Sequence, residues 1–361
     1  MITWRQGLLG LVLLALAGLL LAWSGLIGIG AGSGHWKITD LVLHWAMEQS
    51  VETAALSVEE PPELDEPRQI RRAAGHFEAS CAFCHGSPLR GRPPLSDRMT
   101  PPPPPLTQSA EIWSAAELFV IVQQGVKFTG MPAWIAPERA DEVWAMVSFL
   151  RVLPGMDAAT YRDLAFGTGP PSEADADPVL ANCARCHGFD GGTDGGAFPM
   201  IGGLPEAYLR DTLQAFANGT RQSGIMRFAA AGLTPDAIAR VSAHYASQRP
   251  PAAPPGEELT AGLLAHGEKI ATEGIPEERV PACGRCHADR PGRNPAFPEL
   301  DGQAAWYLEE QLHLFKAGAR GGGPYARLMA KVVPGLTPED IEAVAAYYAS
   351  LPATPQAAAT R

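Results

Sequence analysis

The longest apolar stretch of the chain lies at its N-terminus. Residues 8–21 are almost continuously apolar, and residues 6–34 contain no charged side chain. The apolar core of a secretory signal is about 7–15 residues long, whereas a helix that spans a membrane needs about 20. The length therefore predicts a membrane anchor over residues 1–34, with a signal cleaved among the small residues 31–34 as the alternative. Because Arg5 is the one charged side chain of this segment, either form leaves the remainder of the chain outside the cytoplasm.

An amphipathic segment and a linker follow over residues 35–66. Leu41, Val42 and Trp45 recur at helical spacing, and Trp36 precedes them. Tryptophan and lysine favour the headgroup region of a membrane. The helix therefore either docks on the membrane or on an integral partner, or it packs on the next part of the chain. The acidic, proline-rich end of the segment predicts a stiff linker.

Helical patterns separated by proline- and glycine-rich connections divide the rest of the chain into three units. We call them domain one, domain two and domain three, and they cover residues 67–155, 173–249 and 257–352. The connections lie at residues 156–178 and around the proline-rich residues 250–256.

Within domain one, the pattern predicts helices over residues 68–80, 115–122 and 138–153, the last of them amphipathic. The five consecutive prolines 101–105 cannot lie inside a helix, so they predict an extended loop that walls the functional site.

Domains two and three are copies of one another. Positions from Pro199 to Arg221 match positions from Pro298 to Arg320 at a constant offset of 99, and the later Leu-Thr-Pro and Tyr-Ala-Ser triplets match at an offset of 103. Such self-similarity is typical of a duplicated structural unit. The change of offset predicts a four-residue insertion in domain three, in or near residues 321–324.

Three copies of the pattern C-x-x-C-H use all six cysteines of the chain, one copy in each domain. Two thiols on one helical turn, followed at once by histidine, form the attachment signature of c-type haem. A zinc site or a redox disulfide also uses C-x-x-C, but zinc modules bring two pairs into one small unit and a redox disulfide does not need the histidine. The pattern therefore predicts three covalently attached haem c groups, at Cys81, Cys84 and His85, at Cys183, Cys186 and His187, and at Cys283, Cys286 and His287.

The repeat also indicates the second axial ligand of each iron. Met226 aligns with Met329, each seven residues before its Leu-Thr-Pro, whereas Met200 has no methionine counterpart. In domain one, Met131 lies between glycine and proline and is expected on a loop that reaches the iron, with Met99 as the second candidate. The alternative for each is a plain core methionine. The predicted iron ligands are His85, Met131, His187, Met226, His287 and Met329.

Histidine–methionine ligation raises the reduction potential and leaves no open coordination position. It indicates outer-sphere electron transfer, with no catalytic residue and no small-molecule substrate. The formal net charge of −11 argues against a nucleic-acid partner and suits a redox partner with a basic patch. The remaining histidines are expected at surface or packing positions: His35, His44, His76, His244, His266 and His313.

Weaker patterns concern the surroundings of each haem. An attachment histidine usually donates its second ring N–H to a carbonyl, and Pro199, Pro298 and the prolines 101–105 are the suppliers we expect. Because Pro178 shortens the helix before Cys183, we expect domain two to depend on contacts with its neighbouring domains. We also expect its haem to be more exposed to solvent than the other two. Four recurring side chains either contact haem edges or propionates or are ordinary surface residues: Tyr208, Tyr307, Arg221 and Arg320.

Each domain resembles a class I cytochrome c, with a helix, C-x-x-C-H, a loop, a methionine and a C-terminal helix such as residues 338–351. Domain one is similar to cytochrome domains fused to membrane anchors in bacterial respiratory chains, through residues 129–134. Domains two and three together resemble the dihaem cytochrome c4 family through residues 297–303, 307–312, 315–318 and 345–349. Domain two departs from this family at Leu204, where domain three has the family-like Gln303.

The resemblance implies an all-α fold of three tandem cytochrome c-type haem domains behind an N-terminal transmembrane helix. It places the chain in the bacterial cytoplasmic membrane as a single-pass protein, with its haem domains on the periplasmic side. The expected function is transfer of single electrons from a quinol-oxidising complex to a terminal oxidase or another periplasmic acceptor. A cytochrome subunit of a periplasmic dehydrogenase is the alternative, and a haem peroxidase, which requires a five-coordinate iron, is a third hypothesis. The expected partners are the membrane, through the N-terminal helix, and redox proteins.

Overall fold

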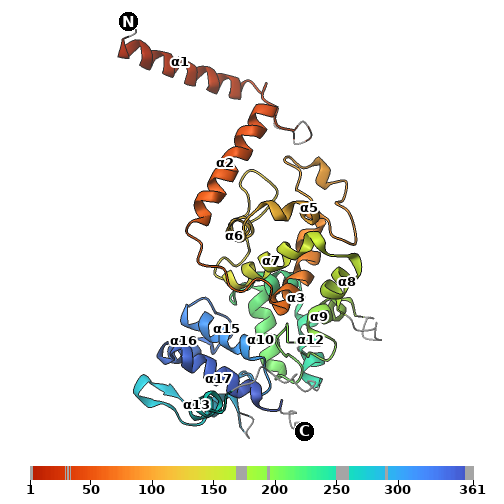
Figure 1. Ribbon diagram of the computed structural model, residues 1–361, viewed down its shortest axis with the longest axis vertical. Helices are drawn as coiled ribbons and strands as arrows, with labels where there is room; N and C mark the ends of the chain where they lie inside the picture. Colours follow the sequence, from red (N-terminus) through yellow and green to blue (C-terminus); the bar gives the residue numbers. More distant parts are fainter. Residues whose placement is uncertain are drawn as a thin grey trace.

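The computed structural model shows a molecule built almost entirely of helices, as predicted (Figure 1). Along the long axis, α1 and α2 lead into domain one, and domains two and three lie beyond it, beside each other. The connection predicted at residues 250–256 and the centre of the one at 156–178 lie outside the described residues. The structure describes residues 3–28, 30, 32, 34–167, 177–192, 196–248, 260–288 and 292–353.

The N-terminal apolar run forms α1 (Trp4–Trp23). Thr3 begins this helix, because its side chain accepts a hydrogen bond from the Gln6 N–H while the Gln6 side chain accepts one from the Thr3 N–H. Within the described part of the chain, α1 is the one helix long and apolar enough to cross a membrane, and none of it is buried against protein. These properties fit a membrane anchor, and a signal sequence shares them.

The next helix, α2 (Lys37–Ala55), has two differently placed halves. Its C-terminal half packs on α6 (Ala115–Gln124), and Val51 is buried there. Trp36, just before the helix, and Trp45, near its middle, remain exposed. The helix therefore packs on domain one, which confirms one of the two interpretations, and docking on a membrane or an integral partner stays a prediction.

Domain one forms a core between α3, α6 and α7, in which the apolar face predicted for residues 138–153 is buried. Glu66 caps the first helix, and Pro67 occupies the position where its missing N–H costs nothing. The prolines 101–105 lie outside helix and strand, as predicted. The elements are α3 (Pro67–His76), a π-helical turn (Phe77–Cys81), α4 (Ala82–His85), α5 (Leu106–Ser109), α6 (Ala115–Gln124) and α7 (Ala140–Val152).

From the attachment motif onward, domains two and three share an order of helices, in agreement with the sequence repeat. Thr234 and Thr337, from the two Leu-Thr-Pro triplets, cap the last helix of each domain, and proline follows at the first helical position. Domain two contains α9 (Pro178–His187), α10 (Glu206–Ala217), α11 (Gly224–Ala230) and α12 (Pro235–Ser247). Domain three contains α13 (Ala261–Thr272), α14 (Gly284–His287), α15 (Ala305–Lys316), α16 (Ala326–Val332) and α17 (Pro338–Ser350).

Two of the elements that were not predicted affect how the domains are built. The connection expected at residues 156–178 contains α8 (Ala158–Phe166), whose Tyr161 is fully buried and donates a hydrogen bond to Glu78 of domain one at 2.7 Å. Domain three has a short antiparallel hairpin before its cysteines, in which Gly274–Ile275 pairs with Val280–Pro281. Both elements are too short to give a clear sequence period.

The four-residue insertion of domain three lies against domain two. The Gly321 N–H donates to Oε1 of Gln222 at 2.8 Å, and a Cβ at Gly321 would lie 2.2 Å from the Thr220 carbonyl oxygen. Gly322, at φ 83°, would bring a Cβ to 2.6 Å from Cβ of Arg221. Glycine is therefore required here because the two backbones meet.

Candidate haem-binding sites

The three attachment motifs lie on short helices, as the sequence predicts. In domain one the chain runs without interruption from α3 through the π-helical turn into α4, which ends at His85. In domain two the motif forms the end of α9, and in domain three it forms α14. Residues three apart lie on one face of a helix, so the two thiols of each motif are neighbours. The structure joins none of the six cysteines in a disulfide, so their sulfurs can attach to haem.

Proline carbonyls orient two of the three histidine rings. Nδ1 of His85 lies 2.8 Å from the carbonyl oxygen of Pro104, inside the five-proline run. Nδ1 of His287 lies 2.8 Å from the carbonyl oxygen of Pro298. Both contacts confirm the carbonyl suppliers expected in these domains. When Nδ1 donates to a carbonyl, Nε2 is left as the ring nitrogen that can bind iron.

The third ring, His187, is buried beside the Pro199 carbonyl but is not in hydrogen-bonding geometry with it. Burial lowers the pKa of His187 to about 4 and lowers the pKa of His85 and His287 in the same direction. The three imidazoles are therefore held neutral, which is the form that binds a metal. Burial also raises the pKa of the first thiol in each motif: Cys81, Cys183 and Cys283.

Met131 lies on a loop, as its flanking glycine and proline predict. Its N–H donates to Oγ1 of Thr129 at 3.1 Å, and its carbonyl accepts from the Val126 N–H at 3.2 Å. The second candidate, Met99, reaches the same loop, because its terminal methyl carbon would lie 2.2 Å from a Cβ at Gly130. The fold thus brings the two candidate methionines of domain one to the same loop, and Met131 as the iron ligand stays a prediction.

Met226 and Met329 occupy matching places on the short helices α11 and α16, and both are partly buried. Oγ of Ser223 accepts a hydrogen bond from the Met226 N–H at 3.0 Å, which fixes the start of α11. Met200, which fails the repeat test, is buried between domains two and three, where the Gln303 side chain binds its N–H and its carbonyl at 2.8 and 2.9 Å. Met200 therefore has a packing role.

Four recurring side chains form one cluster between domains two and three, in which Arg221 is buried and the others are partly buried: Tyr208, Tyr307, Arg221 and Arg320. Arg221 donates to the Tyr307 hydroxyl and to Oε1 of Gln311 at 3.0 Å each, and Arg320 donates to the same Gln311 oxygen at 2.6 Å. In the described part of the chain, neither guanidinium forms an ion pair with a carboxylate. Burial, with the charge of Arg221, lowers the pKa of Arg320 to about 10. Two cations of this kind suit the propionate carboxylates of a haem.

Domain one and α8 cover the attachment helix of domain two. A Cβ at Gly75 of α3 would lie 3.1 Å from Sγ of Cys186, and the Arg185 guanidinium lies 4.6 Å from the centre of the Phe166 ring. These contacts confirm that domain two packs against its neighbour, domain one with α8. Both cysteines of domain two are partly buried, whereas Cys286 of domain three is exposed. The greater exposure expected for the haem of domain two stays a prediction.

The charged contacts between domains were not predicted. Arg139, at the start of α7, donates to Glu310 of α15 at 2.7 Å, and Arg72 of α3 pairs with the same carboxylate at 2.9 Å. Asp141 and Glu142 also bind Arg139, at 2.7 and 3.1 Å. Charged residues at these positions of an amphipathic helix normally indicate a face exposed to solvent. Glu310, the partner of Arg139, lies 171 residues further along the chain. The sequence therefore held no signal for this cluster.

The six histidines outside the motifs lie at surface or packing positions. His266 pairs with Asp340 at 2.7 Å on the surface of domain three. His76 is buried where domain one meets domain two, edge-on to Trp134 and Phe228 at 5.1 and 5.5 Å between ring centres. Burial lowers the pKa of His76 to about 4, so the ring is a neutral packing group.

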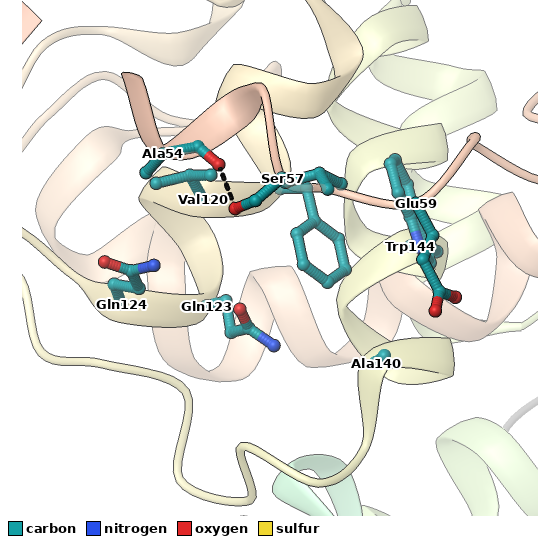
Figure 2. A pocket seen from close by; sticks show the side chains of 10 residues that line it. Ala54, Ser57, Glu59, Val120, Gln123, Gln124, Ala140 and Trp144 are labelled. Carbon is teal, nitrogen blue, oxygen red and sulfur yellow. Dashed lines mark hydrogen bonds between the residues drawn. The ribbon is translucent and has the colours of Figure 1, made fainter. Parts of the chain in front are cut away.

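A hollow of about 310 Å³ lies apart from the attachment motifs, between α2, α6 and α7 (Figure 2). Gln123, Trp144 and Glu59 line it, and the Ser57 hydroxyl beside it donates to the Ala54 carbonyl at 2.8 Å. None of the described residues that line this hollow is a cysteine, histidine or methionine. The candidate chemistry therefore stays with the three attachment motifs.

Comparison with protein families assigns a known type to each of the three motif-bearing regions. The family described as Cytochrome C oxidase, cbb3-type, subunit III matches residues 68–150. The family described as Cytochrome c matches residues 177–247 and 264–352.

Individual relatives match over about half of the chain. A thiosulfate dehydrogenase electron acceptor of Thiomonas intermedia is 36% identical over 197 residues, which is 54% of this chain and 90% of that protein. A cytochrome c4 of Pseudomonas aeruginosa is 30% identical over 178 residues, 47% of this chain and 84% of that protein. The crystal structure of reduced recombinant cytochrome c4 from Pseudomonas stutzeri is 28% identical, with a TM-score of 0.44, and covers 50% of this chain and 100% of its own.

The attachment motifs, the neutral imidazoles, the family matches and the sequence relatives agree. Cytochrome c domains bind haem c through thioether bonds from the two cysteines of such motifs, and the histidine is a ligand of the iron. The chain belongs to the class I c-type cytochromes, with a cbb3-type subunit III domain followed by two domains of the cytochrome c4 kind.

Proposed function

We propose that this protein is a membrane-anchored trihaem cytochrome. It passes single electrons between a respiratory donor, such as a quinol-oxidising complex, and a terminal oxidase or another periplasmic acceptor. A bound haem c would supply a one-electron Fe(III)/Fe(II) couple, and a methionine as the second protein ligand of the iron would favour the reduced state. The residues that hold the three haems are Cys81, Cys84, His85 and Met131, then Cys183, Cys186, His187 and Met226, then Cys283, Cys286, His287 and Met329.

One contact supports the proposal more than any other, the packing of α3 on Cys186. A Cβ at Gly75 would lie 3.1 Å from the Cys186 sulfur, so a side chain here would crowd that sulfur. Six residues after Gly75, the same helical path reaches Cys81. A sulfur proposed to carry the second haem thus touches the helix that carries the first. Because electron tunnelling weakens steeply with distance, this contact favours direct exchange between the two sites.

Domains two and three make their own close contact. Nε1 of Trp306 donates to the Gly196 carbonyl at 2.6 Å, beside the Gln303 bonds to Met200. The cluster of Arg221 and Arg320 lies at the same boundary. These contacts support electron exchange between the second and third haems, so that the three sites form one array.

The membrane side of the proposal depends on the first two helices. With Arg5 on the cytoplasmic side, α1 would anchor the chain in the bacterial cytoplasmic membrane and leave the haem domains in the periplasm. The exposed tryptophans Trp36 and Trp45 of α2 suit the headgroup region next to that anchor. Domain one, which packs on α2, would then be the haem domain closest to the membrane.

The relatives favour a second candidate, the electron acceptor of a periplasmic dehydrogenase. Two of them, from Thiomonas intermedia and Stutzerimonas stutzeri, are thiosulfate dehydrogenase electron acceptors, at 36% and 31% identity. In that role, domains two and three would take electrons from the dehydrogenase, and domain one would pass them towards the membrane.

Stopped-flow reduction of the oxidised, purified full-length protein separates the two candidates. Quinol with membrane vesicles that contain a quinol-oxidising complex should reduce all three haems under the first proposal. Thiosulfate with a thiosulfate dehydrogenase should reduce them under the second. Failure of both donors to reduce any haem, or a mass corresponding to fewer than three haems per chain, would contradict the proposed function.

A further inference from the structure

Domain one binds the segment of domain two that leads to Met226. Oε1 of Glu142, on α7, accepts a hydrogen bond from the Ser223 hydroxyl at 2.5 Å, and its Oε2 accepts one from the Gly224 N–H at 2.5 Å. Arg139, one turn earlier on α7, donates to the Gln222 carbonyl at 3.0 Å. Three consecutive residues of domain two are therefore held from domain one, and the last of them lies two residues before Met226.

The Ser223 hydroxyl connects Glu142 to the methionine. Its Oγ donates to the carboxylate and accepts from the Met226 N–H at 3.0 Å, so a chain of two hydrogen bonds joins Glu142 to the Met226 backbone. Glu142 and Ser223 are 3% and 2% exposed. Buried hydrogen bonds to a charged group are stronger than average, and breaking them leaves partners without water to replace the lost bond.

Trp134 completes the contact from the Met131 loop of domain one. Its Nε1 donates to Oε2 of Glu142 at 3.2 Å. A Cβ at Gly224 would lie 2.2 Å from the same Nε1, so the indole rests directly on the Gly224 backbone. The segments that carry the proposed ligands Met131 and Met226 therefore meet at one carboxylate.

The internal repeat provides a comparison within the same chain. At the offset of 103 that aligns Met226 with Met329, Ser223 falls on Ala326 and Gly224 on Arg327. The copy in domain three keeps the methionine but lacks both the hydroxyl and the glycine. These two features accompany the contact with domain one and are not needed to build the helix itself.

We infer that Glu142 is a positioning residue for Met226, so that domain one completes the haem site of domain two. The inference rests on the proposed function, in which Met226 is the sixth ligand of that haem. A thioether is a weak ligand, so its bond to iron depends on how firmly the backbone holds it in place. The haem of domain two, called haem two below, would then keep its methionine ligand and its reduction potential only while domain one packs against domain two.

The test uses the full-length protein with its haems attached. Proton NMR of the reduced protein shows a separate ring-current-shifted methyl signal for each axial methionine, and the Met226→Leu variant identifies the signal of haem two. Glu142→Ala should remove or broaden that signal, leave the signals of the other two haems in place, and speed carbon monoxide binding at haem two about tenfold or more. Glu142→Gln, which keeps one acceptor oxygen, should restore most of the signal.

Asp141→Asn is the matched control. It also removes a carboxylate partner of Arg139 in the contact between domains, but Asp141 does not bind residues 222–224. If Asp141→Asn disturbs haem two as much as Glu142→Ala, or if Glu142→Ala leaves the haem two signal unchanged, the positioning role is refuted. If Met226→Leu itself changes no methyl signal, the ligand assignment in the proposed function is wrong, and this outcome is distinct from failure of the positioning role.

Discussion

At the level of single residues, the predicted ligands differ in how firmly the fold holds them. Pro104 and Pro298 carbonyls orient His85 and His287, and burial keeps the rings neutral. Domain one has two candidates for the methionine ligand, because Met99 contacts the loop on which Met131 lies. Which sulfur binds iron decides whether the glycine–proline loop sets the potential of the first haem.

We predict that Met131→Leu opens haem one and Met99→Leu does not. Leucine fills nearly the volume of methionine without the sulfur, so the packing is kept while the ligand is lost. The Met131→Leu variant should bind carbon monoxide at one haem, detected by a visible difference spectrum of the reduced protein, and the potential of that haem should fall. Carbon monoxide binding by Met99→Leu instead would exchange the roles of the two residues.

At the level of elements, the contact between α3 and α9 sets the spacing of the first two attachment motifs. Gly75 lies inside α3, where alanine would normally stabilise the helix by about 1 kcal/mol. A Cβ at this position would lie 3.1 Å from the Cys186 sulfur, closer than ordinary van der Waals contact. The close approach of α3 and α9 therefore favours glycine at this position, although alanine would stabilise the helix α3 more.

We predict that Gly75→Leu slows electron exchange between the first and second haems and lowers the free energy of unfolding by about 1–3 kcal/mol, because the larger side chain forces α3 and α9 apart. Flash reduction of one haem followed by absorbance would measure the exchange, and urea titration the stability. Gly262→Leu is the control, since a Cβ at this helical glycine meets nothing within 4 Å. An unchanged exchange rate in Gly75→Leu would show that electrons do not cross at this contact.

The elements that the sequence predicts are those that bury a face within their own domain. Residues such as Val143 and Val147 give α7 a clear period because their partners lie in the same domain. The helix α8 was missed because it buries little more than Tyr161 and Ala165. For the sites, the motifs and the proline carbonyls follow from local spacing. The role of Glu142 could not be predicted, because it arises where two domains meet.

At the level of the whole molecule, one buried ion cluster joins domain one to domain three. Two guanidinium groups, Arg72 and Arg139, lie among the three carboxylates of Asp141, Glu142 and Glu310. When all five groups are ionised, the cluster has a net charge of −1. Away from water, such an excess of negative charge favours uptake of a proton by one of the carboxylates. Burial and the charge of Asp141 raise the pKa of Glu310 from 4.5 to about 7.

A raised carboxyl pKa gives a definite sign to the effect of pH on stability. Below pH 4.5 the Glu310 side chain is protonated in both the folded and the unfolded chain. Between pH 4.5 and about 7 the unfolded chain loses this proton first, so stability falls as pH rises, by up to about 3 kcal/mol. Above that range both states are ionised and the contribution no longer changes.

We predict that Glu310→Gln, which resembles the protonated side chain at every pH, removes this dependence. The free energy of unfolding of the variant minus that of the parent should rise by up to about 3 kcal/mol between about pH 5 and pH 8. Urea unfolding followed by tryptophan fluorescence would measure it. Asp157→Asn is the control, because hydrogen bonds from Thr160 and Ala159 lower the pKa of this exposed carboxyl, and its difference from the parent should stay constant over that range. A constant difference for Glu310→Gln as well would mean that Glu310 stays ionised and that any proton taken up by the cluster resides on Glu142, whose pKa burial also raises.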